Sequence, residues 1–283
     1  MVLLCCLLVA GTAFAKTGTL LVAFGTSMDS ARPAIDDIEK AYKKAAGNEP
    51  VLLAFTSDII RNKLAKEGKP VLSVNAAMNE LARAGTLTRS QNPVPAHRPR
   101  RGIQPDSNAW SSKNITKNPG VFKTVKVGYP LLVSEKDLDA VVKVVLASLP
   151  KDRKPGDAVV LMGHGNDRGP GDLTLAATAA AFHKADPHVW LATVEGSNSF
   201  DNVLPKLKAS GAKRVWLQPF MIVAGDHANN DLAGPEEDSW ASRIKAAGMT
   251  PMPNLKGLGQ LKGIQDIFLS HTQNAVVDLA NTK

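Results

Sequence analysis

Two stretches of the chain, GTLLVAFGTS at residues 18–27 and GDAVVLMGHG at residues 156–165, constrain the fold more than any other feature. Each is a continuous apolar run that ends in glycine, and a helical pattern follows it. Such a run is typical of a strand buried on both faces, as in a parallel sheet covered by helices. The chain therefore begins the same unit twice, which predicts two similar α/β domains, consistent with a duplication.

Strand and helix patterns alternate through the rest of the chain, which predicts a parallel sheet with helices on both faces in each domain. We place the N-terminal domain at residues 16–150 and the C-terminal domain at residues 151–283. The predicted strands are residues 19–24, 51–55, 125–129, 158–162, 189–194 and 214–223. The predicted helices are residues 30–46, 58–66, 69–83, 134–149, 173–184, 200–209, 235–247 and 264–279.

Residues 1–15 contain an apolar run without charged side chains, followed by Ala13-Phe14-Ala15 before Lys16. This pattern predicts a signal peptide that is cleaved after Ala15, and hence a periplasmic protein. The alternative is a buried N-terminal strand. Both cysteines of the chain lie in this segment, so the mature protein would have no disulfide or thiolate metal site. Any bound metal would then need His, Asp or Glu ligands.

The formal net charge of +8 raises the question of a nucleic-acid partner. Residues 86–120 alone contribute 6 Lys or Arg against 1 acid, a net +5, so the remainder carries 8 − 5 = +3. Aromatic residues make up only 5% and do not alternate with basic ones, which argues against nucleic-acid binding. No apolar run reaches the roughly 20 residues that span a bilayer, so we expect no membrane partner for the mature protein.

Residues 86–120 also contain 5 Pro and only 7 hydrophobic residues in 35, where the alternation of strands and helices requires another strand. One interpretation is a basic linker. The other is a frameshift: reading VPAHRPRRGIQ at residues 94–104 one nucleotide out of frame permits the peptide SLHTVPGEEF. This peptide would supply a strand end, a histidine and two glutamates. We predict that residues 86–120 are largely out of frame.

Three side chains with metal-binding chemistry follow predicted strands of the second domain: His164, Glu195 and His227. Ligands of parallel α/β sheets bind at the carboxyl ends of the strands. Two imidazoles and one carboxylate suit a divalent first-row metal with open coordination positions. Asp226 and Asp231 lie near His227, and a carboxylate can orient an imidazole. For each of the three, a structural role is the alternative.

Other chemistries fit the sequence less well. The glycine-rich GNDRGPGD at residues 165–172 lacks the spacing of a phosphate-binding loop. The turn LMGHG at residues 161–165 lacks the serine of a nucleophile elbow.

The motifs LLVAFGTS, VVLMGHGN, ATVEGSNSF and QPFMIVAGDHANNDLAG resemble those of the anaerobic sirohydrochlorin cobaltochelatases, class II chelatases distantly related to ferrochelatase. The resemblance covers residues 16–83 and 121–283. The shifted-frame peptide SLHTVPGEEF resembles the loop of the family that this sequence lacks at residues 86–120. The resemblance implies a chelatase-like fold, with an active-site cleft between the two domains. It further implies that His164 is the catalytic residue and a metal ligand, and that Glu195 and His227 are the other ligands.

The resemblance implies a lyase-type chelatase that inserts Co²⁺ into sirohydrochlorin without ATP, in cobalamin biosynthesis. Its partners would be a tetrapyrrole and a divalent metal, with Fe²⁺ or Ni²⁺ as alternative ions. No cofactor is expected beyond the substrate metal, although bound haem is left open, as is a homo-oligomer. Basic residues such as Arg32, Lys126 or Arg168 could steer the acidic substrate. The rival hypothesis is a non-catalytic periplasmic carrier of haem, another tetrapyrrole or metal.

Overall fold

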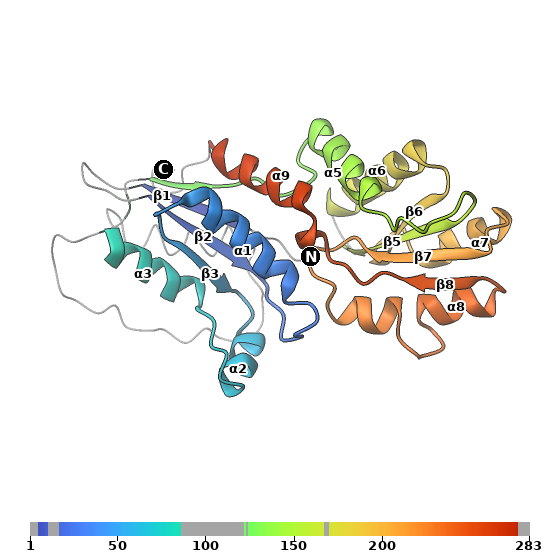
Figure 1. Cartoon of the computed structure of the whole chain (residues 1–283), viewed down its shortest axis with the longest axis horizontal. Helices are drawn as coiled ribbons and strands as arrows, with labels where there is room; N and C mark the ends of the chain where they lie inside the picture. The colour runs from blue at the N-terminus through green and yellow to red at the C-terminus, as the bar shows by residue number, and fades with distance from the viewer. Residues whose placement is uncertain (1–4, 11–16, 86–121, 123, 167–169, 277–283) are drawn as a thin grey trace. The chain divides into compact units, whose positions relative to one another are not determined.

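The structure, a computed structural model, describes residues 5–10, 17–85, 122, 124–166 and 170–276. The chain forms two compact units, each built around a four-stranded sheet (Figure 1). One unit comprises Thr26–Lys40 and Leu131–Ile267, and the other comprises Leu3–Gly25, Ala41–Pro130 and Phe268–Lys283. The division differs from the predicted boundary at residue 150, because the chain passes between the units after Gly25 and Pro130 and within helices α1 (Pro33–Ala46) and α9 (Lys262–Gln273).

The sheet of the Leu131–Ile267 unit is entirely parallel, as the sequence predicts. Its strand order is β6-β5-β7-β8. The strands are β5 (Ala158–Gly165), β6 (Val189–Glu195), β7 (Arg214–Pro219) and β8 (Thr250–Pro253). The helices are α5 (Glu135–Ala147), α6 (Pro170–Ala185), α7 (Phe200–Ala209) and α8 (Trp240–Ala246), with a π-helix η1 (Ala228–Leu232) and a 3₁₀ helix η2 (Leu258–Gln260).

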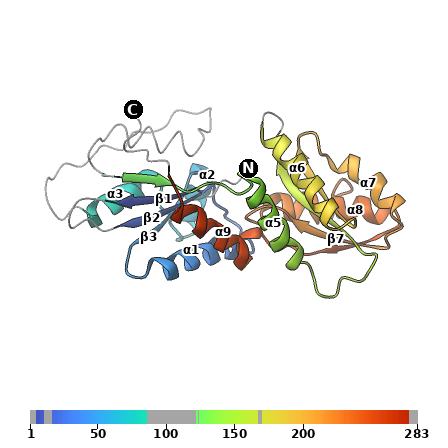
Figure 2. The same ribbon diagram turned by 90° about the horizontal axis from the view of Figure 1, so that it is seen from above.

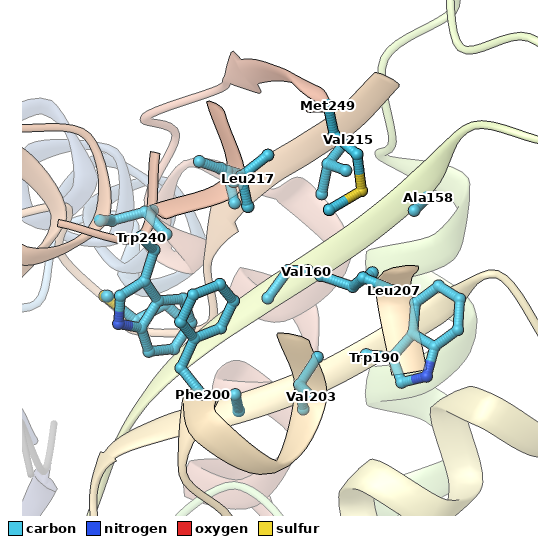
Figure 3. Close-up of a cluster of buried hydrophobic side chains, with 14 of the residues drawn as sticks. Ala158, Val160, Trp190, Phe200, Val203, Leu207, Val215, Leu217, Trp240 and Met249 are labelled. Atoms are coloured by element: carbon cyan, nitrogen blue, oxygen red, sulfur yellow. The ribbon is translucent and has the colours of Figure 1, made fainter. Parts of the chain in front are cut away.

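A hydrophobic core lies between one face of this sheet and helices α7 and α8 (Figure 3). Successive side chains of a strand point to opposite faces, so alternate residues of β5 enter this core, Ala158, Val160 and Met162. Phe200 and Trp240, from α7 and α8, stack at the core with ring centroids 4.5 Å apart and planes inclined by 7°. On the other side, Phe182 of α6 packs edge-on against Phe220. The sheet is therefore covered on both faces.

The sheet of the other unit has the order β3-β2-β1-β4 and is mixed rather than purely parallel. Its strands are β1 (Cys5–Ala10), β2 (Gly18–Ala23), β3 (Val51–Phe55) and β4 (Thr124–Val127). The departure from the prediction is β1, which pairs antiparallel with both β2 and β4. Residues 5–10 thus form a strand, the alternative interpretation of the N-terminal segment, whereas residues 1–4 and 11–16 lie outside the described part.

Helices cover this mixed sheet as well. Helix α2 (Asp58–Lys66), at its predicted bounds, follows the N-cap Ser57, whose Oγ accepts a hydrogen bond from the backbone N–H of Ile60. Helix α3 (Val74–Gly85) contributes Val74, Ala77, Met78 and Leu81 to a core with residues of β2, β3 and β4. Tyr42 of α1 and Thr272 of α9 share a hydrogen bond between their hydroxyl oxygens, 2.7 Å apart, and the two helices lie side by side in Figure 2.

Two further sequence predictions concern residues 86–120 and membrane-spanning segments. The segment 86–120, predicted to be out of frame, lies outside them. Within them, no helix is both long and apolar enough to cross a membrane.

Candidate metal and catalytic site

The three predicted site residues come together at the carboxyl ends of strands in the Leu131–Ile267 unit. His164 is the last residue but one of β5, and Glu195 is the last residue of β6. The ladder between these strands pairs Gly165 with Glu195, which sets the two side chains at the same edge of the sheet. His227 follows β7 and immediately precedes the π-helix η1. A parallel sheet places these chain segments together because all its strands end at one edge.

The two imidazoles lie in contact. Their ring centroids are 5.0 Å apart and their planes are nearly perpendicular, at 85°. An ion bound about 2.0–2.1 Å from a ring nitrogen lies about 3 Å from the ring centroid, so this spacing allows His164 and His227 to share one ion. The side chains are accessible from solvent, with 27% of His164 and 41% of His227 exposed.

Hydrogen bonds define the protonation pattern of both rings. Nδ1 of His164 lies 3.1 Å from the carbonyl oxygen of Gly165, which can only accept, so Nδ1–H donates and Nε2 keeps its lone pair when the ring is neutral. Nδ1 of His227 lies 2.5 Å from Oδ2 of Asp231, one turn further along the π-helix. This carboxylate orients the ring and leaves Nε2 of His227 available for a metal.

Glu195 completes the set from β6. Its Oε2 lies 4.0 Å from Nδ1 of His164, and 52% of its side chain is exposed. Among the residues described, no three His, Cys, Asp or Glu side chains already have the spacing of a complete metal site. Because Glu195 is long and half exposed, rotation of its side chain can bring the carboxylate toward an ion held by the two imidazoles.

Gly165 holds the ends of β5 and β6 unusually close together. Its φ is +85°, and a Cβ built on it would lie 1.8 Å from the carbonyl oxygen of Glu195. No other residue fits this position without moving one of the two strand ends. Gly165 belongs to the strand itself, because β5 extends beyond its predicted end at residue 162.

The predicted residues differ in their surroundings. Of the two acids near His227, Asp231 makes the contact, while Asp226 is exposed. Among the basic residues predicted to steer a substrate, Arg32 forms an ion pair with Asp36 at 2.7 Å, Lys126 is half-buried on β4, and Arg168 is outside the described residues.

Sequence reasoning missed Asp172, on the first turn of α6, which accepts hydrogen bonds from the loop that follows Glu195. This contact joins residues 25 positions apart, and no local spacing pattern signals it.

Comparison with known proteins identifies the family of this chain. The family described as cobalt chelatase (CbiK) matches residues 17–277. The sirohydrochlorin cobaltochelatase CbiKC of Nitratidesulfovibrio vulgaris is 34% identical over 264 residues, which cover 92% of this chain and 91% of that protein. The sirohydrochlorin cobaltochelatase of Salmonella typhimurium is 30% identical over 266 residues, which cover 92% and 97%.

Among solved structures, the sirohydrochlorin chelatase SirB of Bacillus subtilis subspecies spizizenii, in complex with cobalt, is 13% identical with a TM-score of 0.45, over 88% of this chain and 90% of that one. The family match spans most of the chain, including all three strand-end residues. The chain therefore belongs to the cobalt chelatase (CbiK) family.

Proposed function

We propose that this protein inserts Co²⁺ into sirohydrochlorin, without ATP, as a step of cobalamin biosynthesis in the periplasm. The contact between His164 and His227, with Glu195 beside them, carries the proposal. The substrate is that of the two cobaltochelatases to which the chain is 34% and 30% identical. The periplasmic location follows from the predicted signal peptide, and independence from ATP follows from the resemblance and from the absence of a phosphate-binding spacing in the sequence.

Insertion of a divalent ion into a tetrapyrrole requires the loss of two pyrrole N–H protons. Nε2 of His164 can accept one of these protons when it does not bind the ion, because Nδ1 already donates to the Gly165 carbonyl, and the second proton passes to solvent. His227, oriented by Asp231, and Glu195 can hold the incoming ion beside it. Two imidazoles and one carboxylate leave coordination positions open, so the ion can pass to the macrocycle nitrogens.

The test follows the absorption spectrum of sirohydrochlorin during insertion of Co²⁺ in the absence of ATP. Wild-type protein should catalyse many turnovers, and His164→Ala should lose at least about 100-fold, the range of one general base. The matched control is His183→Ala, on the exposed side of α6, which should insert at the wild-type rate. Unchanged insertion by His164→Ala would reject the assigned role.

The same assay separates the proposal from its rivals. Parallel measurements with Fe²⁺ and Ni²⁺ determine the preferred ion, since the same donor set suits all three metals. Tight binding of one tetrapyrrole per chain, with haem included among the ligands, and no turnover would instead identify a carrier.

A further inference from the structure

The loop after Glu195 is tied to helix α6 by a single side chain, Asp172. Oδ1 of Asp172 accepts a hydrogen bond from the backbone N–H of Ser197 at 3.0 Å, and Oδ2 accepts one from the Ser197 hydroxyl at 2.7 Å. These two bonds lower the pKa of the Asp172 carboxyl, so it is ionised at neutral pH. Both carboxylate oxygens thus hold a residue two positions beyond the predicted metal ligand.

The glycine between Glu195 and Ser197 brings the loop into contact with the same carboxylate. Gly196 has φ +92°, and a Cβ built on it would lie 2.4 Å from Oδ1 of Asp172 and 2.7 Å from the carbonyl oxygen of Asn166. The backbone therefore fits against Asp172 only because this position has no side chain.

The other end of the loop is fixed to its own strand. The backbone N–H of Thr193 donates to the carbonyl of Asn198 at 2.8 Å, and the amide of Asn198 donates to the carbonyl of Leu191 at 2.6 Å. Residues 196 and 197 are the part of this turn that β6 itself does not restrain, since Glu195 is the last residue of the strand and pairs with Gly165. The bonds to Asp172 supply that restraint from α6.

We propose that Asp172 is a positioning residue for metal binding, which holds the 195–197 loop so that the Glu195 carboxylate faces His164 and His227. This inference deepens the proposed function, because it rests on Glu195 being a metal ligand. Asp172 acts through Glu195: its own oxygens are occupied by Ser197. Loss of a residue that orients a metal ligand typically lowers metal affinity 10- to 100-fold. Because Asp172 acts on Glu195 through the backbone of the loop, we expect a loss at the lower end of this range.

The experiment measures the affinity of the full-length protein for Co²⁺ alone, together with kcat and KM for Co²⁺ in the insertion assay. Asp172→Ala should weaken Co²⁺ binding about tenfold. Asp172→Asn should stay within about threefold of wild type, because the amide oxygen still accepts from Ser197 N–H and the amide N–H can donate to the Ser197 hydroxyl. Equal losses in the two variants would mean that the charge acts directly on the ion, which overturns the positioning role.

A double-mutant cycle with Glu195→Ala gives the sharper test. If Asp172 acts through Glu195, Asp172→Ala should cause no further loss of Co²⁺ affinity once the Glu195 carboxylate is absent. A full, additive loss in that background would overturn the inference.

The control is Asp201→Ala, which removes the corresponding first-turn acid of the next helix, α7, where the carboxylate pairs with Arg243 instead of a loop. It should bind Co²⁺ as the wild type does.

If Asp172→Ala fails to fold, Ser197→Ala keeps Asp172 and removes only the hydroxyl bond. It should weaken Co²⁺ binding about threefold, and wild-type affinity in this variant would overturn the inference. Because Co²⁺ binding is measured without tetrapyrrole, failure of the proposed reaction and failure of this inference give different results.

Discussion

A buried charged group in the Leu131–Ile267 unit, Asp157, gives a quantitative test of what stabilises this unit. Asp157 directly precedes β5, at the amino end of the sheet, and only 8% of its side chain is exposed. Its Oδ1 accepts from Arg214 Nε at 3.0 Å, and its Oδ2 accepts from Trp216 Nε1 at 3.2 Å, from Lys154 N–H at 2.8 Å and from a second Arg214 nitrogen. These hydrogen bonds, those from Arg214 foremost, lower the pKa of Asp157 well below its usual range despite the opposing effect of burial.

Asp157→Asn keeps the shape of the side chain but removes the charge and places an amide N–H among groups that can only donate. A hydrogen bond to a charged group contributes about 1.5–3 kcal/mol, and breaking a buried ion pair costs about 3–5 kcal/mol. Because Arg214 is a quarter exposed, we expect a loss of about 3 kcal/mol in the free energy of unfolding at pH 7. With a urea dependence of about 2 kcal/mol per M, the midpoint should fall by about 1.5 M.

The pH dependence has a definite sign. A carboxyl whose pKa is lower in the folded state stabilises the protein above its unfolded pKa, here near 3.8, and loses that effect as the pH falls toward its folded pKa. The difference between wild type and variant should therefore be constant from pH 7 to about pH 5 and shrink below about pH 4.

Tryptophan fluorescence during urea unfolding is a suitable measurement, since Trp190, Trp216 and Trp240 all lie in this unit. Asp201→Asn, in a pair whose carboxylate side chain is 73% exposed, is the control and should change stability by less than about 0.5 kcal/mol. A loss below about 1 kcal/mol for Asp157→Asn, or a difference that persists unchanged to pH 3, would refute this account of the network.

The remaining predictions concern the site and the N-terminus. Asp231→Asn should lower the affinity for Co²⁺ about tenfold without loss of thermal stability, as measured by calorimetry; an unchanged affinity would contradict the orienting role. Gly165→Ala should lose insertion activity and several degrees in Tm, because its Cβ meets the Glu195 carbonyl, whereas Gly156→Ala, with a similar φ of +83° but no atom within 4 Å, should keep the activity. Intact-mass measurement of the protein from a periplasmic fraction should give a chain that begins at Lys16; a mass that includes residues 1–15 would exclude cleavage.

Much of the Leu131–Ile267 unit follows from the sequence because strands β5, β6 and β7 are mostly buried. Continuous apolar runs predict β5 and β6, and the helix at residues 200–209 has the predicted bounds. The edge at which His164, Glu195 and His227 meet follows from parallel topology alone. The end of β5 differs from the prediction, since it extends through Gly165, where pairing with Glu195 and not side-chain pattern determines the last strand residue.

Other features of the site depend on contacts that no local pattern encodes. The π-helix Ala228–Leu232 was not predicted, and it sets the Asp231 carboxylate against His227. Strand β8 was also missed, because TPMP contains two prolines, which normally argue against a strand. It lies at the edge of its sheet, where proline is tolerated because one side of the strand needs no ladder hydrogen bonds. The bond from Asp172 to Ser197 is tertiary and becomes visible only in the fold.

The two sheets differ in the third strand of their order. This difference connects the N-terminal segment, residues 1–15, with residues 86–120. In the order β6-β5-β7-β8, the third place is taken by β7, a parallel strand that follows α7. In the order β3-β2-β1-β4, the third place is taken by β1, antiparallel to both neighbours. If the two units arose by duplication, we expect this place to belong to a strand encoded between α3 and β4, the stretch predicted to be out of frame.

Removal of β1 from this sheet would leave the facing backbone N–H and C=O groups of β2 and β4 without their ladder partners, which would destabilise the sheet. Cleavage of the signal peptide and translation of residues 86–120 as written are therefore hard to combine in one stable protein. If the gene carries the shifted frame, the restored strand can take the third place and the N-terminal segment is free to be cleaved. If the frame is unbroken, the N-terminal strand has to stay. Resequencing the gene across residues 84–122, together with the intact mass of the protein, decides between these two outcomes.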